Sequence, residues 1–158
     1  MREVLSVENL TLTYPAGEQL LTAVSGVSFS VNAGDRLVIL GSSGCGKSSL
    51  LNAIGGFIKP THGQILLDGS PVKQPGPDRV MVFQGFDQLL PWKTVRENIA
   101  FGLIASGKCK GKSAVERADA ALGRVKLEEF ANSYPHTLSG GMKQRIALAR
   151  ALAMEPRV

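Results

Sequence analysis

The chain has 158 residues, 44% of them hydrophobic, and 18 Lys plus Arg against 13 Asp plus Glu give a formal net charge of +5. This length suits one domain or part of one, the apolar content excludes a wholly disordered chain, and the 18 glycines follow no collagen-like period. No apolar run approaches the ~20 residues that cross a bilayer, residues 1–4 do not resemble a secretory leader, and two cysteines fit neither a disulfide framework nor a metal site.

The charge pattern and the cysteines also narrow the cellular setting. Basic residues are scattered, apart from a cluster at 108–112, and they are not interleaved with aromatic residues, so we expect no nucleic-acid partner. The cluster itself is typical of a solvated loop. The two cysteines, Cys45 and Cys109, suit a reducing cytoplasm.

The first third of the chain predicts β-strands. Apolar and polar residues alternate over 10–14 and again over 27–31, and turn residues follow at 15–17 and 32–35. Residues 37–40, Leu-Val-Ile-Leu, form an uninterrupted apolar run that favours a strand buried on both faces.

The middle of the chain predicts one helix and two further strand segments. Apolar residues fall at helical spacing from Leu50 to Ile58, and the helix is expected to end at residues 59–60, Lys-Pro. A short hairpin is expected over 64–69, with its turn at Asp-Gly, and residues 80–83 predict a second buried strand.

The remainder predicts helices. Thr94–Glu97 and Ser113–Glu116 have the capping-box pattern, and a further helix is expected to begin at 139–141 and to end at Pro156. This last helix is expected to bury one face, made of Ile146, Ala149 and Leu152. The fold class is therefore α/β, with an antiparallel β portion and a helical insertion at about 85–138.

Residues 41–48, Gly-Ser-Ser-Gly-Cys-Gly-Lys-Ser, match the phosphate-loop pattern G-x-x-x-x-G-K-[ST] in full. Glycines let backbone N–H groups surround phosphates, and the helix that follows adds the positive end of its dipole. Lys47 would reach the β- and γ-phosphates, and the Ser48 hydroxyl would bind Mg²⁺. We read Cys45 as a small residue at a variable position of the loop. The expected nucleotide-binding residues here are Gly41, Ser42, Ser43, Gly44, Cys45, Gly46, Lys47, Ser48 and Ser49.

A second motif narrows the class of nucleotide-binding protein. Residues 138–145, Leu-Ser-Gly-Gly-Met-Lys-Gln-Arg, resemble the LSGGQ signature of ATP-binding-cassette proteins, and the resemblance covers Val4 to Val158. The first residues of this motif also open a helix, which makes a second anion-binding helix start. The resemblance implies a P-loop NTPase that uses ATP and Mg²⁺, with two subunits closing head to tail around ATP.

The resemblance also assigns roles to single residues. It implies that Gln84 contacts Mg²⁺ and the attacking water, that Tyr14 stacks on adenine, and that Ser139 and Gly141 contact ATP bound to the partner subunit. The implied catalytic residues are therefore Lys47, Gln84, Ser139 and Gly141, and the implied metal ligands are Ser48 and Gln84. Two plainer alternatives stay open, a surface role for Gln84 and a core-facing strand position for Tyr14.

Residues 83–92, Phe-Gln-Gly-Phe-Asp-Gln-Leu-Leu-Pro-Trp, followed by Thr-Val-Arg-Glu-Asn-Ile, resemble the ATPase subunits of nitrate, sulfonate and taurine importers, and Met142 is common in that group. The resemblance implies a peripheral subunit on the cytoplasmic face of the cell membrane. It would bind a membrane permease and, indirectly, a periplasmic or extracellular substrate-binding protein. Leu89, Leu90 and Trp92 would form an apolar edge for a partner helix, unless Trp92 packs inside the helical insertion.

The family pattern continues where this sequence stops. In the family, a Walker B strand ending in Asp-Glu and a switch histidine follow the signature helix, and Val158 lies where that strand would begin. Asp68 belongs to a hairpin turn and does not replace the missing carboxylate, and His62 and His136 are expected to be exposed loop residues. We therefore expect residues 1–158 to be the N-terminal part of a longer ATPase, incomplete at its C-terminus, and to be inactive, weak in ATP binding and prone to aggregate alone.

Two other functions stay open. One is a soluble ATP-binding-cassette protein of DNA repair or chromosome structure, although the short spacing between motifs and the lack of CxxC pairs argue against it. The other is a non-hydrolysing ATP sensor, which carboxylates beyond Val158 would exclude. The transported substrate is expected to be chosen largely by the permease and any binding protein, and the direction of transport is implied by the resemblance alone. The choice between homodimer and heterodimer stays open.

Overall fold

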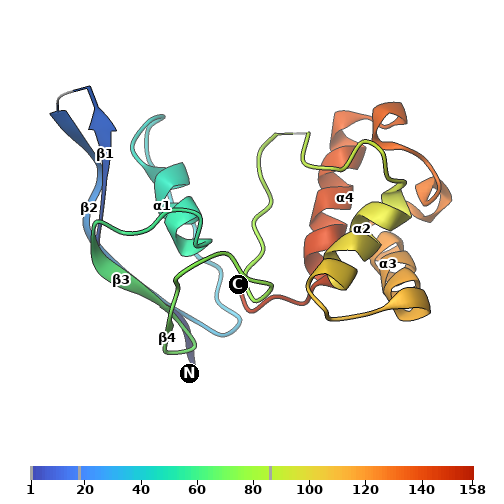
Figure 1. The fold of residues 1–158 in the computed structure, drawn as a ribbon, viewed down its shortest axis with the longest axis horizontal. Helices are drawn as coiled ribbons and strands as arrows, with labels where there is room; N and C mark the ends of the chain where they lie inside the picture. Colours follow the sequence, from blue (N-terminus) through green and yellow to red (C-terminus); the bar gives the residue numbers. More distant parts are fainter. Residues whose placement is uncertain (1, 18, 86) are drawn as a thin grey trace. The chain divides into compact units, whose positions relative to one another are not determined.

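The computed structural model describes residues 2–17, 19–85 and 87–158, which fold as two compact units (Figure 1). The first unit comprises Met1–Arg79 with Arg157–Val158, and the second comprises Val80–Pro156. Each unit has its own hydrophobic core, so each is described by itself. No helix in the described part of the chain is both long and apolar enough to cross a bilayer.

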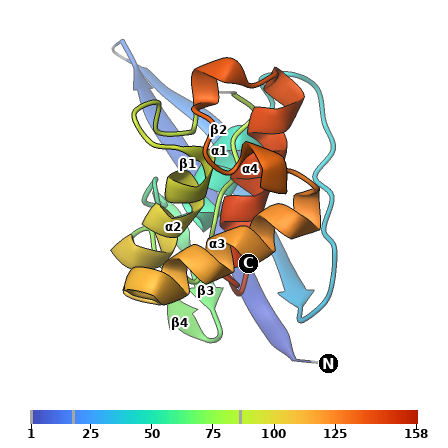
Figure 2. The ribbon, with the colours of Figure 1, turned by 90° about the vertical axis from the view of Figure 1, so that its right-hand side faces the viewer.

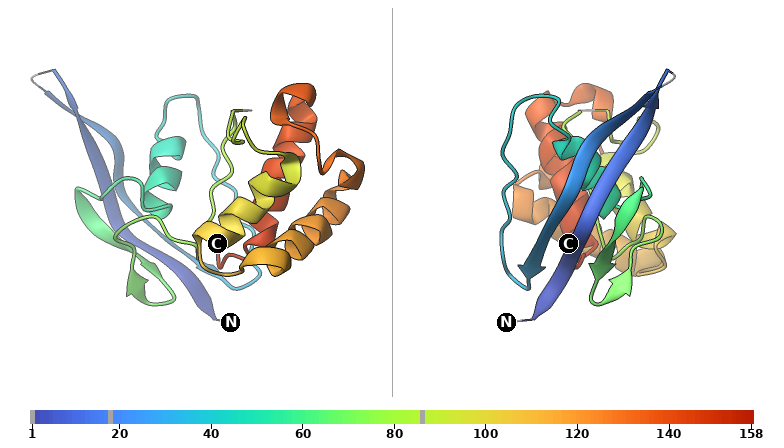
Figure 3. Two further views of the ribbon diagram at one scale, coloured as in Figure 1. Left: turned by 45° about the vertical axis from the view of Figure 1, so that its right-hand side comes forward. Right: turned by 90° about the vertical axis from the view of Figure 1, so that its left-hand side faces the viewer.

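The first unit is a four-stranded antiparallel sheet with one helix. Its strands are β1 (Glu3–Ala16), β2 (Gln19–Asn32), β3 (His62–Leu67) and β4 (Ser70–Pro71), and α1 spans Lys47–Ile54. The strand order is β2-β1-β3-β4, and the two long strands form a twisted ribbon with β3 alongside β1 (Figure 3). Val7 of β1 lies opposite Phe29 of β2 and Ile65 of β3, which fixes the register on both sides.

Alternation in β1 produces the core of this unit. Leu10 and Leu12 point to the same face and are fully buried, and α1 covers that face with Leu50 and Ile54. Each such burial stabilises the fold by about 2 kcal/mol. The expected β3–β4 hairpin is confirmed: Asp68 and Gly69 have φ of 45° and 76°, the double positive value of the tight turns that join twisted strands.

The two buried strands expected at 37–40 and 80–83 are wrong for this structure. Neither segment is a strand, and Leu40 is 86% exposed. A strand buried on both faces needs hydrogen-bonded neighbours, and the described residues pair none with either segment. The first helix is also shorter than expected. It ends at Ile54 because Gly55 and Gly56 follow, and Gly56 has a φ of 81°.

The second unit is helical. It contains α2 (Val95–Ala105), α3 (Gly111–Val125) and α4 (Gly140–Ala153), with short 3₁₀ helices η1 (Glu128–Phe130) and η2 (Pro135–Thr137) before α4 (Figure 2). The three long helices share one core, whose fully buried large side chains are Val95, Ile99, Leu103, Leu122 and Ile146. The helices expected here are therefore present, and the bounds of about 85–138 for the insertion stay a prediction.

The helix starts depend on their caps. The capping box at Thr94 is confirmed, because its side chain accepts from the Glu97 N–H while the Glu97 carboxylate accepts from the Thr94 N–H. The box expected at Ser113 is wrong, since α3 begins at Gly111 without a side-chain cap. Packing of the buried face that includes Ala114 and Ala118 sets this start instead.

The buried face of α4 differs from the expectation by one residue. Ile146 and Ala149 are fully buried as expected, but Leu152 is 41% exposed and Ala153 is buried in its place. Positions i, i+3 and i+7 stay on one face of an α-helix, whereas i+6 turns away from it. The helix ends at Ala153, shortly before Pro156.

Candidate functional site

The loop over residues 41–48 leads directly into α1. Gly46 is the N-cap residue of α1 with a φ of 94°, and Gly44 has a φ of 81°. A Cβ on Gly46 would lie 2.2 Å from the carbonyl oxygen of Ala23 on β2, so only glycine fits at this point. The first turn of α1 carries no acidic residue, which leaves its N–H groups and the positive end of its dipole available to an anion.

Lys47 lies across this loop. Its Nζ donates to the carbonyl oxygens of Gly41 at 2.9 Å and Ser42 at 2.6 Å, and lies 3.5 Å from Cys45 Sγ. These partners are neutral, so a phosphate at the loop would give the ammonium a stronger, charge-assisted partner. The arrangement places an ammonium group at the helix start whose N–H groups are available to an anion, which is the chemistry of a phosphate site.

A pocket of 310 Å³ adjoins the loop. Its wall is mostly apolar, with contributions from β2, the 39–40 segment and α1. The lining residues are Ala23, Val24, Ser25, Val27, Ile39, Leu40, Cys45, Gly46, Lys47 and Leu50. Tyr14 is not among them and packs, half-buried, against the core of the first unit, opposite Leu21. Its contact with adenine therefore stays a prediction.

Ser48 and Ser49 occupy the first turn of α1, and the Ser48 side chain is exposed. The described residues contain no group of three or more His, Cys, Asp or Glu that could hold a metal by themselves. One hydroxyl at a phosphate loop fits Mg²⁺ nevertheless, because this ion is commonly held by one or two protein ligands together with substrate phosphates and water. The donor set is therefore suited to a metal that arrives with a nucleotide.

Gln84 lies in the second unit, exposed, in a loop that is tied at both ends. The Gln88 amide accepts from the Phe83 N–H at 3.1 Å and donates to the carbonyl oxygens of Phe83 at 2.9 Å and Gly85 at 2.8 Å. Arg150 of α4 donates to the Gln88 carbonyl oxygen at 2.9 Å. The loop that carries Gln84 is thus attached to α4, the helix that begins within the signature residues.

A pocket of 450 Å³ lies at this attachment. Its lining residues are Phe83, Gly85, Asp87, Gln88 and Arg150. Burial lowers the pKa of the Arg150 guanidinium from its ordinary value. The sequence interpretation missed Gln88 and Arg150. A glutamine four residues after Gln84 was the available signal, but its partner lies 62 residues away in sequence.

Ser139 caps α4, as expected, by accepting a hydrogen bond from the Met142 N–H at 3.3 Å. Gly141 is exposed, and a Cβ added to it would meet no atom within 4 Å among the described residues. Packing within the chain therefore gives no reason for glycine here. His62 and His136 are both exposed, and His62 lies on β3 whereas a loop was expected.

The apolar edge expected at 89–92 is only partly present. Leu89 turns inward and is 6% exposed, whereas Trp92 is 70% exposed, so packing of Trp92 inside the helical unit is wrong. Beyond Trp92, Lys93 places its Nζ 5.6 Å from the centre of the Phe101 ring, and Phe101 is half exposed. The second unit thus presents aromatic surface beside the start of α2.

Residues 24–158 match the model of the ABC transporter family. The chain belongs to this family. Both motifs, at 41–48 and at 138–145, lie within the matched residues. The resemblance stated from the sequence is therefore confirmed at the level of the family.

Two named relatives are import ATP-binding proteins. The nitrate import ATP-binding protein NrtD of Synechococcus elongatus is 45% identical over 147 residues, covering 92% of this chain and 53% of the relative. The taurine import ATP-binding protein TauB of Rhizobium johnstonii is 51% identical over 136 residues, covering 86% of this chain and 51% of the relative. The chain spans about half the length of these relatives.

A solved structure gives the fold. It is a dimeric ATP-binding cassette in a post-hydrolysis state, bound to ADP and Pi, and it is 37% identical with a TM-score of 0.86. The match covers 96% of this chain and 70% of that one. The ABC chain described here therefore has the fold of a P-loop ATPase cassette, as expected from its motifs.

Proposed function

We propose that this chain is the ATP-binding part of the ATPase subunit of an importer for a small oxyanion such as nitrate, a sulfonate or taurine. The observation that carries the proposal is the loop at 41–48, with its left-handed glycines, its helix start and the Lys47 ammonium across it. The identity to nitrate and taurine import proteins supports the choice of substrate class.

Nucleotide binding follows from the loop. The phosphates of ATP take the place beside the α1 N–H groups, and Lys47 leaves the carbonyl oxygens of Gly41 and Ser42 for the β- and γ-phosphates. Mg²⁺, when bound, neutralises phosphate charge, and the Ser48 hydroxyl would hold it. The adenine extends over β1, where Tyr14 offers its ring. The Gln84 side chain would contact Mg²⁺ and the attacking water.

A second copy or a related subunit completes the site. Ser139 and Gly141 are exposed, and Gly141 has no packing role of its own. In a head-to-tail dimer these residues contact ATP held at the phosphate loop of the other subunit. Contacts from both chains mean that ATP favours the closed dimer, because a ligand shifts an equilibrium through the contacts that differ between its states. ATP hydrolysis by the intact subunit then reopens it.

The partner in the membrane is a permease, with Trp92 as an anchor on the second unit. Exposed tryptophan is typical of interface anchors, and Trp92 is 70% exposed. The subunit is peripheral on the cytoplasmic face of the membrane, and the permease connects it to a substrate-binding protein on the other side. A DNA-repair protein of the same class is not favoured, since the longest helix among the described residues, α3, has only 15 residues.

The test is nucleotide binding by the intact subunit, measured by titration calorimetry with ATP and Mg²⁺. Lys47→Ala should weaken ATP binding about tenfold or more, because it removes a charged phosphate contact. Lys59→Ala is the matched control, since Lys59 is exposed and lies outside the loop. Equal affinity of wild type and Lys47→Ala would contradict the proposal.

A further inference from the structure

Asn98 lies in the first turns of α2 and is the one polar side chain classed as fully buried in the described part of the chain, with 0% exposure. Burying an amide is costly unless its hydrogen bonds are made. Nothing in nucleotide binding uses this residue, so its burial calls for another reason.

The Asn98 amide binds the backbone of the segment just before α2. Its Oδ1 accepts from the Leu90 N–H at 2.7 Å, and its Nδ2 lies within hydrogen-bond distance of the carbonyl oxygens of Leu90 at 3.0 Å, Lys93 at 3.1 Å and Thr94 at 3.0 Å. A carboxylate could make only the first of these bonds, whereas a primary amide has both an acceptor and two donors. The side chain therefore holds residues on both sides of the pair at 91–92.

The same segment is closed by backbone bonds. The Lys93 N–H donates to the Leu90 carbonyl oxygen at 3.2 Å, which makes a four-residue turn with Pro91 and Trp92 at its tip. The turn is joined to α2 by the Thr94 capping box, and the Val95 N–H donates to Ser133 at 2.9 Å. Trp92 is thus exposed on a backbone that is fixed from both ends.

A fixed backbone matters for an exposed aromatic residue. When a partner binds Trp92, the main chain of the 90–94 turn is already ordered, so more of the contact energy appears as affinity.

We propose that Asn98 is the positioning residue that holds Trp92 outward for the permease subunit. This inference rests on the proposed function for its partner, and on the hydrogen bonds of Asn98 for its mechanism. Asn98 acts through the 90–94 turn and does not itself touch the partner.

The experiment uses the intact subunit labelled with 5-fluorotryptophan, with the position-92 signal identified by its loss in Trp92→Phe. Asn98→Ala should broaden or shift that ¹⁹F signal, because the turn loses its side-chain anchor. Leu103→Ala is the matched control: Leu103 is also fully buried on α2 but has no bond to the turn, so it should destabilise the unit and leave the signal in place. An unchanged signal in folded Asn98→Ala overturns the proposal.

A measurement on the wild type keeps the proposal testable if Asn98→Ala does not fold. Backbone ¹⁵N relaxation should give the Trp92 amide an order parameter of about 0.85, the value of rigid backbone, and a value below about 0.6 overturns the proposal.

Permease binding separates the two proposals. Trp92→Ala and Asn98→Ala should each weaken it by about tenfold, and together by no more than Trp92→Ala alone. If Trp92→Ala binds the permease normally, the docking role fails, while the fluorine and relaxation results still decide whether Asn98 fixes the turn.

Discussion

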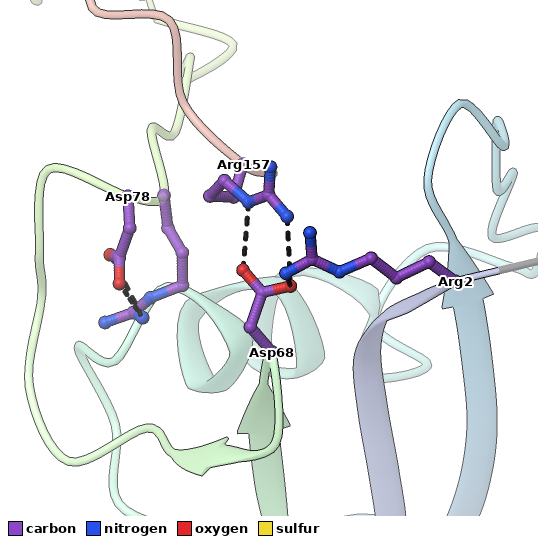
Figure 4. Close-up of polar contacts among 5 residues, drawn as sticks. Arg2, Asp68, Asp78 and Arg157 are labelled. Carbon is purple, nitrogen blue, oxygen red and sulfur yellow. Dashed lines mark hydrogen bonds and ion pairs between the residues drawn. The ribbon is translucent and has the colours of Figure 1, made fainter.

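Arg157 donates two hydrogen bonds to the carboxylate of Asp68. Its Nε donates to Oδ2 at 2.9 Å and its Nη2 donates to Oδ1 at 3.0 Å, and Arg2 adds a third bond to the same carboxylate (Figure 4). Asp68 is in the β3–β4 turn, so the pair ties the residues that follow α4 to the sheet of the first unit. The hydrogen bond from Arg157 holds the pKa of Asp68 below its ordinary value.

This pair predicts a pH dependence. Because the pKa of folded Asp68 is depressed, its contribution to stability is present above the unfolded pKa and is lost as the pH falls through the folded pKa. Arg157→Ala in the intact subunit should lower the melting temperature at pH 7 and have a smaller effect once Asp68 is protonated. Thermal melts at pH 7 and near pH 3 check this. An equal effect on the melting temperature at both pH values would show that the Arg157–Asp68 pair does not stabilise the fold through the charge of Asp68. The exposed Lys112–Glu116 pair supplies a control, since Lys112→Ala should have little effect at either pH.

Gly46 and Gly44 form a matched pair for the loop. Both have positive φ, but only Gly46 faces a backbone atom, the Ala23 carbonyl oxygen, at a distance that a Cβ cannot tolerate. Gly46→Ala should therefore move the loop and reduce ATP affinity at least about tenfold, and Gly44→Ala should reduce it less. Calorimetry with ATP measures both. If Gly44→Ala proves the more damaging, the loop is not held against β2 as described.

Thr94 and Ser113 test the capping assignments. Thr94→Ala removes a cap hydrogen bond and should cost about 1 kcal/mol of unfolding free energy, whereas Ser113→Ala should cost almost nothing because Ser113 caps no helix. Urea denaturation of the intact subunit gives both values. A larger loss at Ser113 would place the start of α3 where the sequence pattern put it.

The motifs and the hairpin could be predicted because their signals are local. Glycines and a lysine at fixed spacing define the loop at 41–48, and the Asp68-Gly69 pair defines the turn of the β3–β4 hairpin. The 37–40 segment could not be assigned in this way, since whether an apolar run becomes a strand depends on partners elsewhere. The Ser113 box failed for a related reason, because packing outweighed a local pattern.

Gln88 illustrates what the sequence could not supply. Its amide closes the Gln84 loop, and its carbonyl oxygen accepts from Arg150, which lies 62 residues away, so this second bond leaves no pattern in neighbouring residues. The sequence predicts that Trp92 belongs to an apolar edge for a partner helix, but it gives no signal for the hydrogen bonds that Asn98 makes to the carbonyl oxygens of Lys93 and Thr94. Hydrogen bonds of this kind, from a side chain to a backbone group, can be identified only from the folded structure.

The hydrogen bonds of the Gln88 amide to Phe83 and Gly85 predict a kinetic effect. Gln88→Ala frees the loop that carries Gln84, so the intact subunit should lose most of its ATP turnover rate while its KM for ATP changes little, because the Gln88 amide bonds to Phe83 and Gly85 and is not part of the loop at 41–48. Gln74→Ala is a control, as Gln74 is exposed in the first unit and accepts a hydrogen bond from Arg79 through its backbone carbonyl oxygen, which the substitution keeps. A raised KM with normal turnover would argue that Gln88 serves binding instead.

The most direct measurement is uptake by the intact subunit assembled with its permease and substrate-binding protein in liposomes, with nitrate and taurine offered separately. We expect one of these two substrates to accumulate in the liposomes. Its accumulation should require ATP on the side of the membrane that carries the subunit, and it should be lost with Lys47→Ala. Uptake that continues without ATP, or that Lys47→Ala leaves unchanged, would contradict it.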